Sequence, residues 1–174
     1  IDYFPEPGGD PKDVLQLLVT QLDYDNYVGR VAIGRIVNGT IACRDELLLC
    51  GEDGDRKVRI SKLYTWKGLG RVNIEQAEAG EIVAISGIAD LNIGDTLTSL
   101  EDPRPLPRTK VDEPTIGITM MANTSPFSGR EGKYVTARQI RERLEKEMLH
   151  NVALKMEETD AIENMKIYGR GELQ

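Results

Sequence analysis

The sequence has few of the residues from which metal and redox sites are built. It contains one histidine and two cysteines in 174 residues, and Cys43 and Cys50 do not form a Cys-x-x-Cys pair. Structural zinc sites draw cysteine and histidine ligands from closely spaced pairs, so no zinc site is expected. We interpret the two thiols as reduced and buried in a cytoplasmic protein, with a disulfide as the less favoured alternative.

A surplus of positive charge and long apolar runs are missing as well. Lys and Arg number 22 against 29 Asp and Glu, which gives a net charge of -7 and a pI near 4.9. This balance argues against a generally polybasic nucleic-acid binder, although it allows a local basic face. No apolar run approaches a membrane span and no signal peptide is visible, so we expect a cytoplasmic protein with no membrane partner.

No phosphate-binding loop is present, although residues 29–41, GRVAIGRIVNGTI, come close to its spacing. A P-loop carries Lys and then Ser or Thr after its second glycine, whereas here Arg35 and Ile36 occupy those positions. Apolar residues alternate between the two glycines, which favours a strand. Asn38-Gly39 between two apolar runs predicts a β-hairpin with a two-residue turn. We therefore predict a hairpin here and no nucleotide site.

No catalytic constellation is present. The single histidine, His150, follows a predicted helix and has no plausible nucleophile beside it. The acidic clusters EDGD and KMEETD fall in predicted turns and are weak as metal sites. We expect no enzyme activity, no metal and no cofactor for this chain.

The first part of the chain has the pattern of an all-β domain. Short strand-like runs from Val14 to about Leu100 are separated by turn sequences such as GEDGD, KGLG, EAGE and NIGD. Strands at this spacing without a helical period predict a closed β-barrel, which we place at residues 1–105. Four prolines within residues 101–114 favour an extended segment, and we assign residues 106–114 as a proline-rich tether.

Residues 115–174 are predicted to form a second, α+β domain. An alternating strand at 115–122 is followed by a loop and then by a helix with Thr136 as its N-cap and Gln139 as its capping-box partner. Two more strands are predicted, at 152–157 and 164–168. The order β-α-β-β is the first part of a ferredoxin-like fold, which would continue with a second helix and a fourth strand. Without them we expect an uncovered apolar face, with marginal stability or self-association.

The chain begins at Ile1 without methionine and ends shortly after GRGEL, so we expect it to be part of a longer protein. Three stretches carry a family resemblance: GRVAIGRIVNGTI, AEAGEIVAISGIADLNIGDTL and SPFSGREGKYVTARQIRERLEKE. Together they resemble the translational GTPases and, within them, the TypA/BipA group, over essentially the whole chain. The one small departure is Gln174, where the family usually has histidine after GRGEL.

The resemblance implies a translation-factor-type β-barrel, the second domain of a ribosome-associated GTPase, followed by a truncated ferredoxin-like third domain. The GTP- and magnesium-binding domain would precede Ile1, and the C-terminal domains would follow Gln174. The implied partners are the small ribosomal subunit with its rRNA, and the protein's own G domain and C-terminal domains. The chain would couple the nucleotide state of the G domain to ribosome contact. The alternative is an intramolecular scaffold that packs on the G domain, with ribosome contacts made by other domains.

Contact with rRNA phosphates requires Lys or Arg side chains that carboxylates do not neutralise. Residues 128–146 carry six basic and three acidic residues in a chain that is otherwise acidic. Arg130 and Lys133 are the first candidates, because they lie in a glycine-containing loop just before a helix N-terminus. Arg138 and Arg141 are further candidates, although each has a glutamate four residues later, which is the pattern of an ordinary solvated helix face.

A second candidate RNA contact lies on the predicted barrel. Lys67 and Arg71 are the first and last residues of the sequence KGLGR, which follows Trp66. Aromatic residues beside cations can stack on nucleic-acid bases, although a packing role is more common for a tryptophan.

Overall fold

The computed structural model describes residues 8–108, 113–130, 132–151, 153–159 and 164–171. The chain divides into two compact units, unit 1 from Ile1 to Lys110 and unit 2 from Val111 to Gln174. The division falls inside the stretch assigned to the tether, residues 106–114. Within the described ranges, no helix is both long and apolar enough to cross a membrane.

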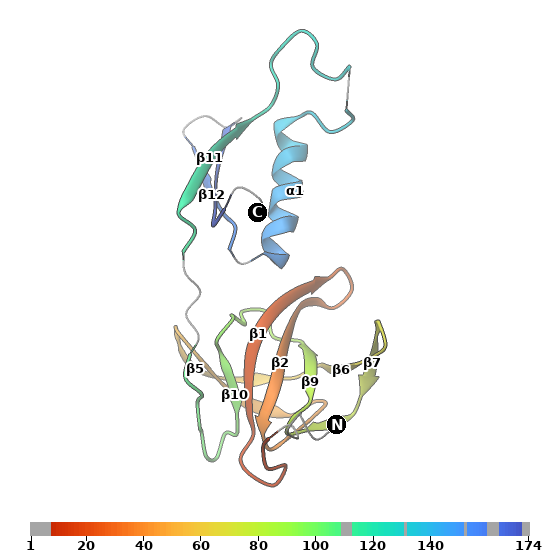
Figure 1. Cartoon of the computed structure of the whole chain (residues 1–174), viewed down its shortest axis with the longest axis vertical. Coiled ribbons are helices and arrows are strands. Elements are labelled where there is room, and N and C mark those ends of the chain that lie inside the picture. The colour runs from red at the N-terminus through yellow and green to blue at the C-terminus, as the bar shows by residue number, and fades with distance from the viewer. Residues whose placement is uncertain (1–7, 109–112, 131, 152, 160–163, 172–174) are drawn as a thin grey trace, which may run out of the picture. The chain divides into compact units, whose positions relative to one another are not determined.

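Unit 1 is built from β-strands (Figure 1). Their bounds are β1 Gln16–Asp25, β2 Gly29–Asn38, β3 Thr40–Ala42, β4 Glu46–Gly51, β5 Gly54–Arg59, β6 Lys62–Lys67, β7 Gly70–Ile74, β8 Gln76–Glu78, β9 Ile82–Ser86 and β10 Thr96–Thr98. Eight of them form one sheet in the order β5-β4-β10-β1-β2-β9-β6-β7, while β3 pairs with β8. The neighbours in this sheet are antiparallel throughout.

The core of unit 1 follows from the two-residue period of its strands. Alternate side chains of β1 point inward as far as Val19, and a β-bulge between Val19 and Gln21 shifts the pattern so that Leu22 is the next buried residue. Leu17 and Ile36 are fully buried. The largest buried side chains come from strands across unit 1 and from the turns between them: Leu17, Val19, Val31, Ile36, Ile41, Leu49, Ile60, Leu63, Ile85, Leu91 and Leu97. The strands curve around this core in Figure 1, and the predicted mainly β, barrel-type fold class is confirmed.

The hairpin predicted at Asn38-Gly39 is wrong. β2 pairs with β1 and β9, and β3 pairs with β8, so the two residues join strands that are not neighbours. Distant partners hold this corner: the Asn38 side-chain oxygen accepts from the Asp10 amide at 3.1 Å, and the Gly39 amide donates to the Asp10 carbonyl at 2.9 Å. Gly39 has φ +78°, but Asn38 does not share the positive φ that a type I′ turn requires.

The segment after β10 is attached to unit 1 and is not a free tether along its first part. The amides of Arg104 and Leu106 donate to the hydroxyls of Thr98 and Thr96 at 3.2 and 3.1 Å. Arg108 then forms an ion pair with Asp95 at 3.4 Å. The extended conformation that the prolines favour therefore lies along β10, and residues 104–108 are a strap on the barrel.

Unit 2 has a three-stranded antiparallel sheet and one helix. The bounds are β11 Ile116–Met121, α1 Ala137–His150, β12 Lys155–Glu158 and β13 Asn164–Gly169. The sheet order β11-β13-β12 places the first strand beside the last, and both pairs are antiparallel. The predicted order β-α-β-β is thus present as an α+β unit, and completion to a ferredoxin-like fold stays a prediction.

The start of α1 agrees with the sequence, whereas the start of β12 differs. The Thr136 hydroxyl accepts from the Gln139 amide at 3.3 Å, and the Thr136 amide donates to the Gln139 side chain at 3.2 Å, which confirms the capping box. β12 begins at Lys155 and not near residue 152, because a turn precedes it. In this turn the Leu154 amide donates to the Asn151 carbonyl at 3.1 Å. Position 152 lies outside the described residues.

One strand of unit 2 exposes apolar side chains. β11 is an edge strand, and Ile116, Ile118 and Met121 are 43%, 55% and 60% exposed. These exposures agree with the predicted uncovered apolar face. Its effect on stability and self-association stays a prediction.

The cysteines are free, as predicted, although Cys43 and Cys50 are each half-buried.

Candidate nucleic-acid interface

The loop between β11 and α1 is organised by two successive turns. The Ser128 amide donates to the Ser125 carbonyl at 3.0 Å, and the Arg130 amide donates to the Phe127 carbonyl at 3.2 Å. Gly129 lies between Phe127 and Arg130 with φ +87°, a conformation that glycine adopts without a steric cost. The turns therefore hold Phe127 and Arg130 on the same side of the loop.

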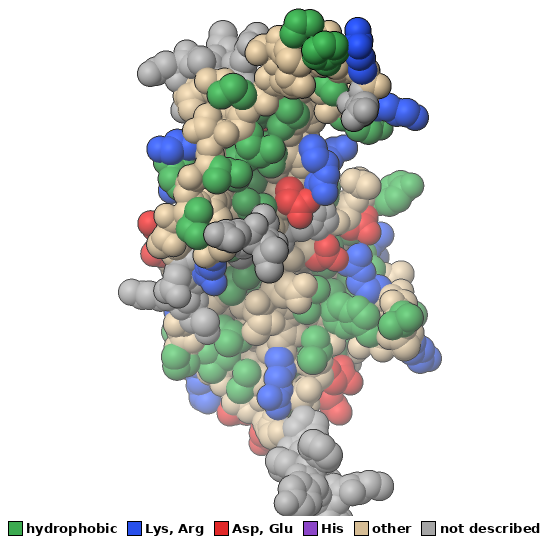
Figure 2. All heavy atoms as spheres, turned by 45° about the horizontal axis from the view of Figure 1, so that its top comes forward, with side chains coloured by type: hydrophobic (Ala, Val, Ile, Leu, Met, Phe, Trp, Pro, Cys, Tyr) green, Lys and Arg blue, Asp and Glu red, His purple; other side chains and the backbone are tan. Residues whose placement is uncertain are grey.

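These two side chains contact each other and are open to solvent. The guanidinium carbon of Arg130 lies 4.7 Å from the centre of the Phe127 ring, which is a cation–π distance. Phe127 is 63% exposed, and Tyr134 at the other end of the loop is 78% exposed. Figure 2 shows hydrophobic and basic side chains together at the end of unit 2 that carries this loop.

The cations of the loop have no carboxylate partner among the residues that the structure describes. Arg130 and Lys133 are both exposed, and no ion pair involves either one within those residues. The helix N-terminus offers fewer free amides than expected, because the Thr136–Gln139 capping box already occupies two of them. The chemical case for anion contact therefore depends on the two side chains.

The candidate arginines on α1 differ from the loop cations, because each of them has an interaction partner. Arg138 forms an ion pair with Glu142 at 3.0 Å, and Arg143 does the same with Glu147. Arg141 is half-buried and also has an interaction partner. These contacts agree with the solvated-face alternative, and a role in RNA contact for Arg138 and Arg141 stays a prediction.

The two candidate residues on the barrel, Lys67 and Arg71, have different surroundings. Lys67 is exposed at the end of β6. Arg71, on β7, forms ion pairs with Asp23 at 3.4 Å and with Asp25 at 3.8 Å. Hydrogen bonds from the backbone amides of Tyr27 and Val28 lower the pKa of Asp25, and the nearby Arg71 adds to the effect, so Asp25 stays charged. Arg71 is thus neutralised, which disfavours a phosphate contact by this residue.

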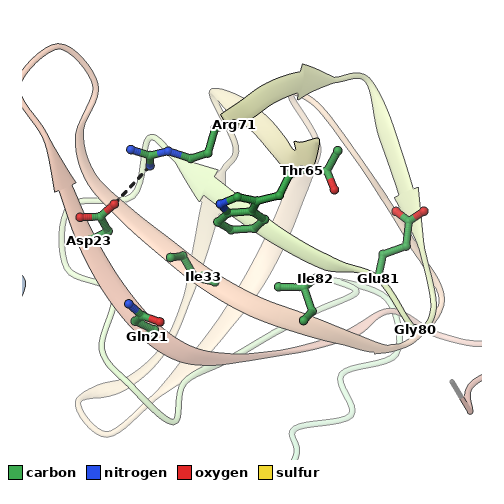
Figure 3. Close-up of a pocket in the computed structure, with 9 residues that line it drawn as sticks. Gln21, Asp23, Ile33, Thr65, Arg71, Gly80, Glu81 and Ile82 are labelled. Atoms are coloured by element: carbon green, nitrogen blue, oxygen red, sulfur yellow. Dashed lines mark ion pairs between the residues drawn. The ribbon is translucent and has the colours of Figure 1, made fainter. Parts of the chain in front are cut away.

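Arg71 and Asp23 stand at one end of a groove of about 820 Å³ in unit 1. In Figure 3 their side chains point toward one another, Glu81 lies at the other end, and Ile33 and Ile82 lie between them. Trp66 lines the same groove. The groove therefore has apolar side chains in its middle, with Gln21 and Thr65 also lining it, carboxylates at both ends and one neutralised cation.

The described residues contain no group of three or more His, Cys, Asp or Glu side chains arranged to hold a metal ion. The expected absences of a metal, a cofactor and a catalytic group remain expectations.

Comparison with known proteins decides the family. Residues 29–98 match the family described as Elongation factor Tu domain 2. Over 99% of its length the chain is 51% identical to "Large ribosomal subunit assembly factor BipA" of Synechocystis sp.. It is 44% identical to proteins of the same name from Salmonella typhimurium and Bacillus subtilis, again over 99% of its length. This chain belongs to the TypA/BipA family.

The chain spans less than a third of these TypA/BipA relatives: 29% of the Synechocystis and Salmonella proteins and 28% of the Bacillus protein. A crystal structure of a Thermus thermophilus protein matches 92% of the chain, and 23% of its own length, with a TM-score of 0.65 at 24% identity. That likeness shows the fold alone. It agrees with a β-barrel followed by an α+β unit.

Sequence reasoning missed two features of the TypA/BipA chain that bear on function. It named Arg130 without its stacking partner Phe127, although a spacing of three residues across a glycine was a usable signal. It also missed the pairing of Arg71 with Asp23 and Asp25. That pairing joins residues almost fifty positions apart, and no local pattern reveals it.

Proposed function

We propose that this chain is the part of a TypA/BipA-family protein that docks on the ribosome, and that the loop carrying Arg130 and Lys133 contacts rRNA. The observation that carries the proposal is an exposed loop with two cations that no described carboxylate neutralises. Such cations bind phosphate by releasing counterions, and they do not first have to break an ion pair. The relatives' name, which refers to large-subunit assembly, supports a ribosomal partner.

In this proposal GTP and magnesium are bound by another part of the protein, and this chain passes the nucleotide state on to the ribosome contact. The strap at residues 104–108 limits how that can happen. Because Leu106 and Arg108 are bonded to unit 1, residues 104–108 move with that unit. The small subunit is the partner that the family resemblance implies, and the relatives' name raises the large subunit as the other.

The barrel favours a second role, as a surface that packs on protein. Its groove has the apolar side chains Ile33 and Ile82 between carboxylates, and Arg71 is already paired with Asp23. A surface of this kind repels phosphates but suits a protein partner with apolar and basic side chains. In this division of roles unit 1 makes protein contacts, including those with the protein's own G domain, and unit 2 contacts RNA.

Pelleting of the chain with separately purified small and large ribosomal subunits, over a salt series, tests the proposal. We expect saturable binding to one subunit that weakens as salt rises. The double variant Arg130→Ala, Lys133→Ala should bind more weakly, and the slope of log affinity against log salt should become shallower by roughly 0.7 to 0.9 for each phosphate that the variant no longer neutralises.

The matched control is the double variant Arg56→Ala, Lys57→Ala, which removes the same charge from unit 1. Both residues are exposed and already paired with carboxylates, so the control should bind like the unchanged chain. Equal weakening by both variants would mean that only net charge matters. Unchanged binding by the Arg130, Lys133 variant would favour the scaffold role for the whole chain.

A further inference from the structure

We propose that Phe127 and Arg130 form a stacking surface for an unpaired base of single-stranded RNA, with Tyr134 as a second exposed ring in the same loop. The inference rests on the proposed function and narrows it, because it names the RNA element that this loop takes. A phosphate site would need only Arg130 and Lys133. The aromatic side chains beside them require a further explanation.

The first observation is the exposure of two large aromatic side chains in one short loop. Aromatic residues make up 5% of the chain, and such side chains are usually at least partly buried. Phe127 and Tyr134 are 63% and 78% exposed, and they flank the loop cations. The other strongly exposed aromatic side chain among the described residues, Tyr27, lies in unit 1 at the turn between β1 and β2. A pair of exposed rings beside cations is the composition of a surface that binds single-stranded nucleic acid.

The second observation is that the Arg130 guanidinium is already placed on a ring. Its central carbon lies 4.7 Å from the centre of Phe127, while the residue as a whole remains exposed. A planar guanidinium held in this way can take a base on its free side and form a stack of base, guanidinium and phenyl ring. Because the arrangement exists before binding, less side-chain entropy is lost when a base arrives.

The third observation is that the backbone fixes this arrangement. The hydrogen bond from the Arg130 amide to the Phe127 carbonyl closes a turn around Gly129, whose φ is +87°. The side chains three residues apart are thereby held together by the main chain. Lys133 follows in the same loop and can neutralise the phosphate of the stacked nucleotide.

The surface selects unpaired RNA. In an A-form duplex the bases are stacked on one another and the major groove is too narrow for side chains, so rings and a guanidinium plane find no base face. In a loop, a bulge or an end, the base faces are available. The structure therefore assigns a single-stranded segment, and not a duplex backbone, to this loop.

Binding of the full chain to labelled RNA probes tests the inference. The probes are a single-stranded oligoadenylate, a duplex of the same length, and the oligoadenylate with abasic positions. Phe127→Leu keeps an apolar side chain without a ring, and Arg130→Lys keeps the charge without the plane. Each should weaken binding to the intact single strand by about 5- to 150-fold, since one stacked base contributes roughly 1 to 3 kcal/mol. Neither should alter the weak binding to the duplex or the abasic strand.

Lys133→Ala is the matched variant in the same loop. It should weaken binding to all three probes alike, because it removes a charge and no stacking surface. Wild-type affinity of Phe127→Leu and Arg130→Lys for the single strand, or equal loss on the duplex, would overturn the inference. Equal affinity of the unchanged chain for intact and abasic strands would do the same.

Ribosome pelleting of the same variants separates the two proposals. If Lys133→Ala loses ribosome affinity while Phe127→Leu keeps it, docking through the loop stands and base stacking is refuted. If the chain binds neither ribosomal subunits nor any probe, the proposed function fails and the stacking surface fails with it. Loss of affinity in both variants supports both proposals.

Discussion

Replacing Arg108 with alanine tests the attachment of the strap to the barrel. Arg108 pairs with Asp95, whose side chain is 2% exposed. One Asp95 oxygen accepts the Asn92 amide at 2.8 Å. The other oxygen has no hydrogen-bond donor and lies 3.4 Å from the Arg108 guanidinium. Removing Arg108 therefore takes away the ion-pair partner of this buried oxygen and leaves only the more distant charge of Arg56.

The magnitude follows from that geometry. An unsatisfied buried polar group costs about 1 to 3 kcal/mol of folding free energy, and more when it is charged. Arg108 also pairs with Glu52, but the Glu52 side chain is 79% exposed, so that pair adds about 0 to 1 kcal/mol. We expect Arg108→Ala to lower the free energy of unfolding of unit 1 by about 1 to 3 kcal/mol. The midpoint temperature of a domain of this size falls by about 4 to 8 °C for each kcal/mol.

Urea unfolding followed by tryptophan fluorescence measures this effect in unit 1 alone, because Trp66 is the single tryptophan of the chain. The control is Lys57→Ala, which breaks an exposed ion pair with Glu46 and should therefore change the free energy of unfolding very little. An Arg108→Ala variant as stable as the Lys57→Ala variant would contradict a stabilising pair between Arg108 and Asp95. It would mean that the strap adds nothing to the stability of the barrel.

The effect of Arg108→Ala should depend on pH. Burial raises the pKa of Asp95 above its ordinary value of 3.8, against the opposing effects of the Asn92 amide hydrogen bond, Arg108 and Arg56, while Asp53 raises it further. The folded chain thus holds this proton more tightly than the unfolded chain, so protonation stabilises the fold as pH falls from the folded-state pKa toward 3.8. In the Arg108→Ala variant the charged form of Asp95 is less stable still. The loss of unfolding free energy caused by the substitution should be largest above the folded-state pKa of Asp95, and it should become smaller as pH falls toward 3.8.

Three further predictions concern single sites. Gly39→Ala should destabilise unit 1 by more than about 2 kcal/mol in the Trp66 assay, since φ is +78° and a Cβ atom would lie 2.5 Å from the Leu15 backbone; an effect below about 0.5 kcal/mol would contradict the close packing at this corner. Thr136→Ala should lower the stability of α1 by about 0.5 to 2 kcal/mol in a circular-dichroism melt and leave the Trp66 transition in place; a shifted Trp66 transition would contradict a local effect. Burial, with Asp55 nearby, raises the pKa of Cys50 to about 11, so alkylation of this thiol, followed by mass spectrometry, should be slow at pH 8 and accelerate toward pH 11; fast alkylation at pH 8 would contradict it.

The sequence predicted local structure better than contacts between distant residues. The capping box of α1 was predictable because Thr136 and Gln139 are three residues apart and interact within one turn. The turn at Asn38 was mistaken for a hairpin because Asp10 and Gln16, which bind the Asn38 side chain, are more than twenty positions away. Local turn chemistry and long-range hydrogen bonding competed there, and the long-range hydrogen bonds determined the conformation.

The same distinction applies to the candidate site. The sequence predicted the basic loop because charge and glycine content are visible in a short window, and the structure left the charge of Arg130 unpaired among the described residues. The sequence also proposed Arg71, which the fold neutralises with two aspartates of β1. Neutralisation of a cation by another strand depends on the sheet register, and a single sequence does not contain that information.

The most direct test of the central claim, contact between this loop and ribosomal RNA, is photo-cross-linking of the full chain bound to ribosomal subunits. A p-azidophenylalanine in place of Phe127 changes the ring very little, and the same substitution at Tyr27, which is 98% exposed in unit 1, is the matched control. We expect a cross-link to RNA from position 127 and none from position 27. Cross-links from position 127 to ribosomal protein alone, or equal RNA cross-linking from both positions, would contradict it.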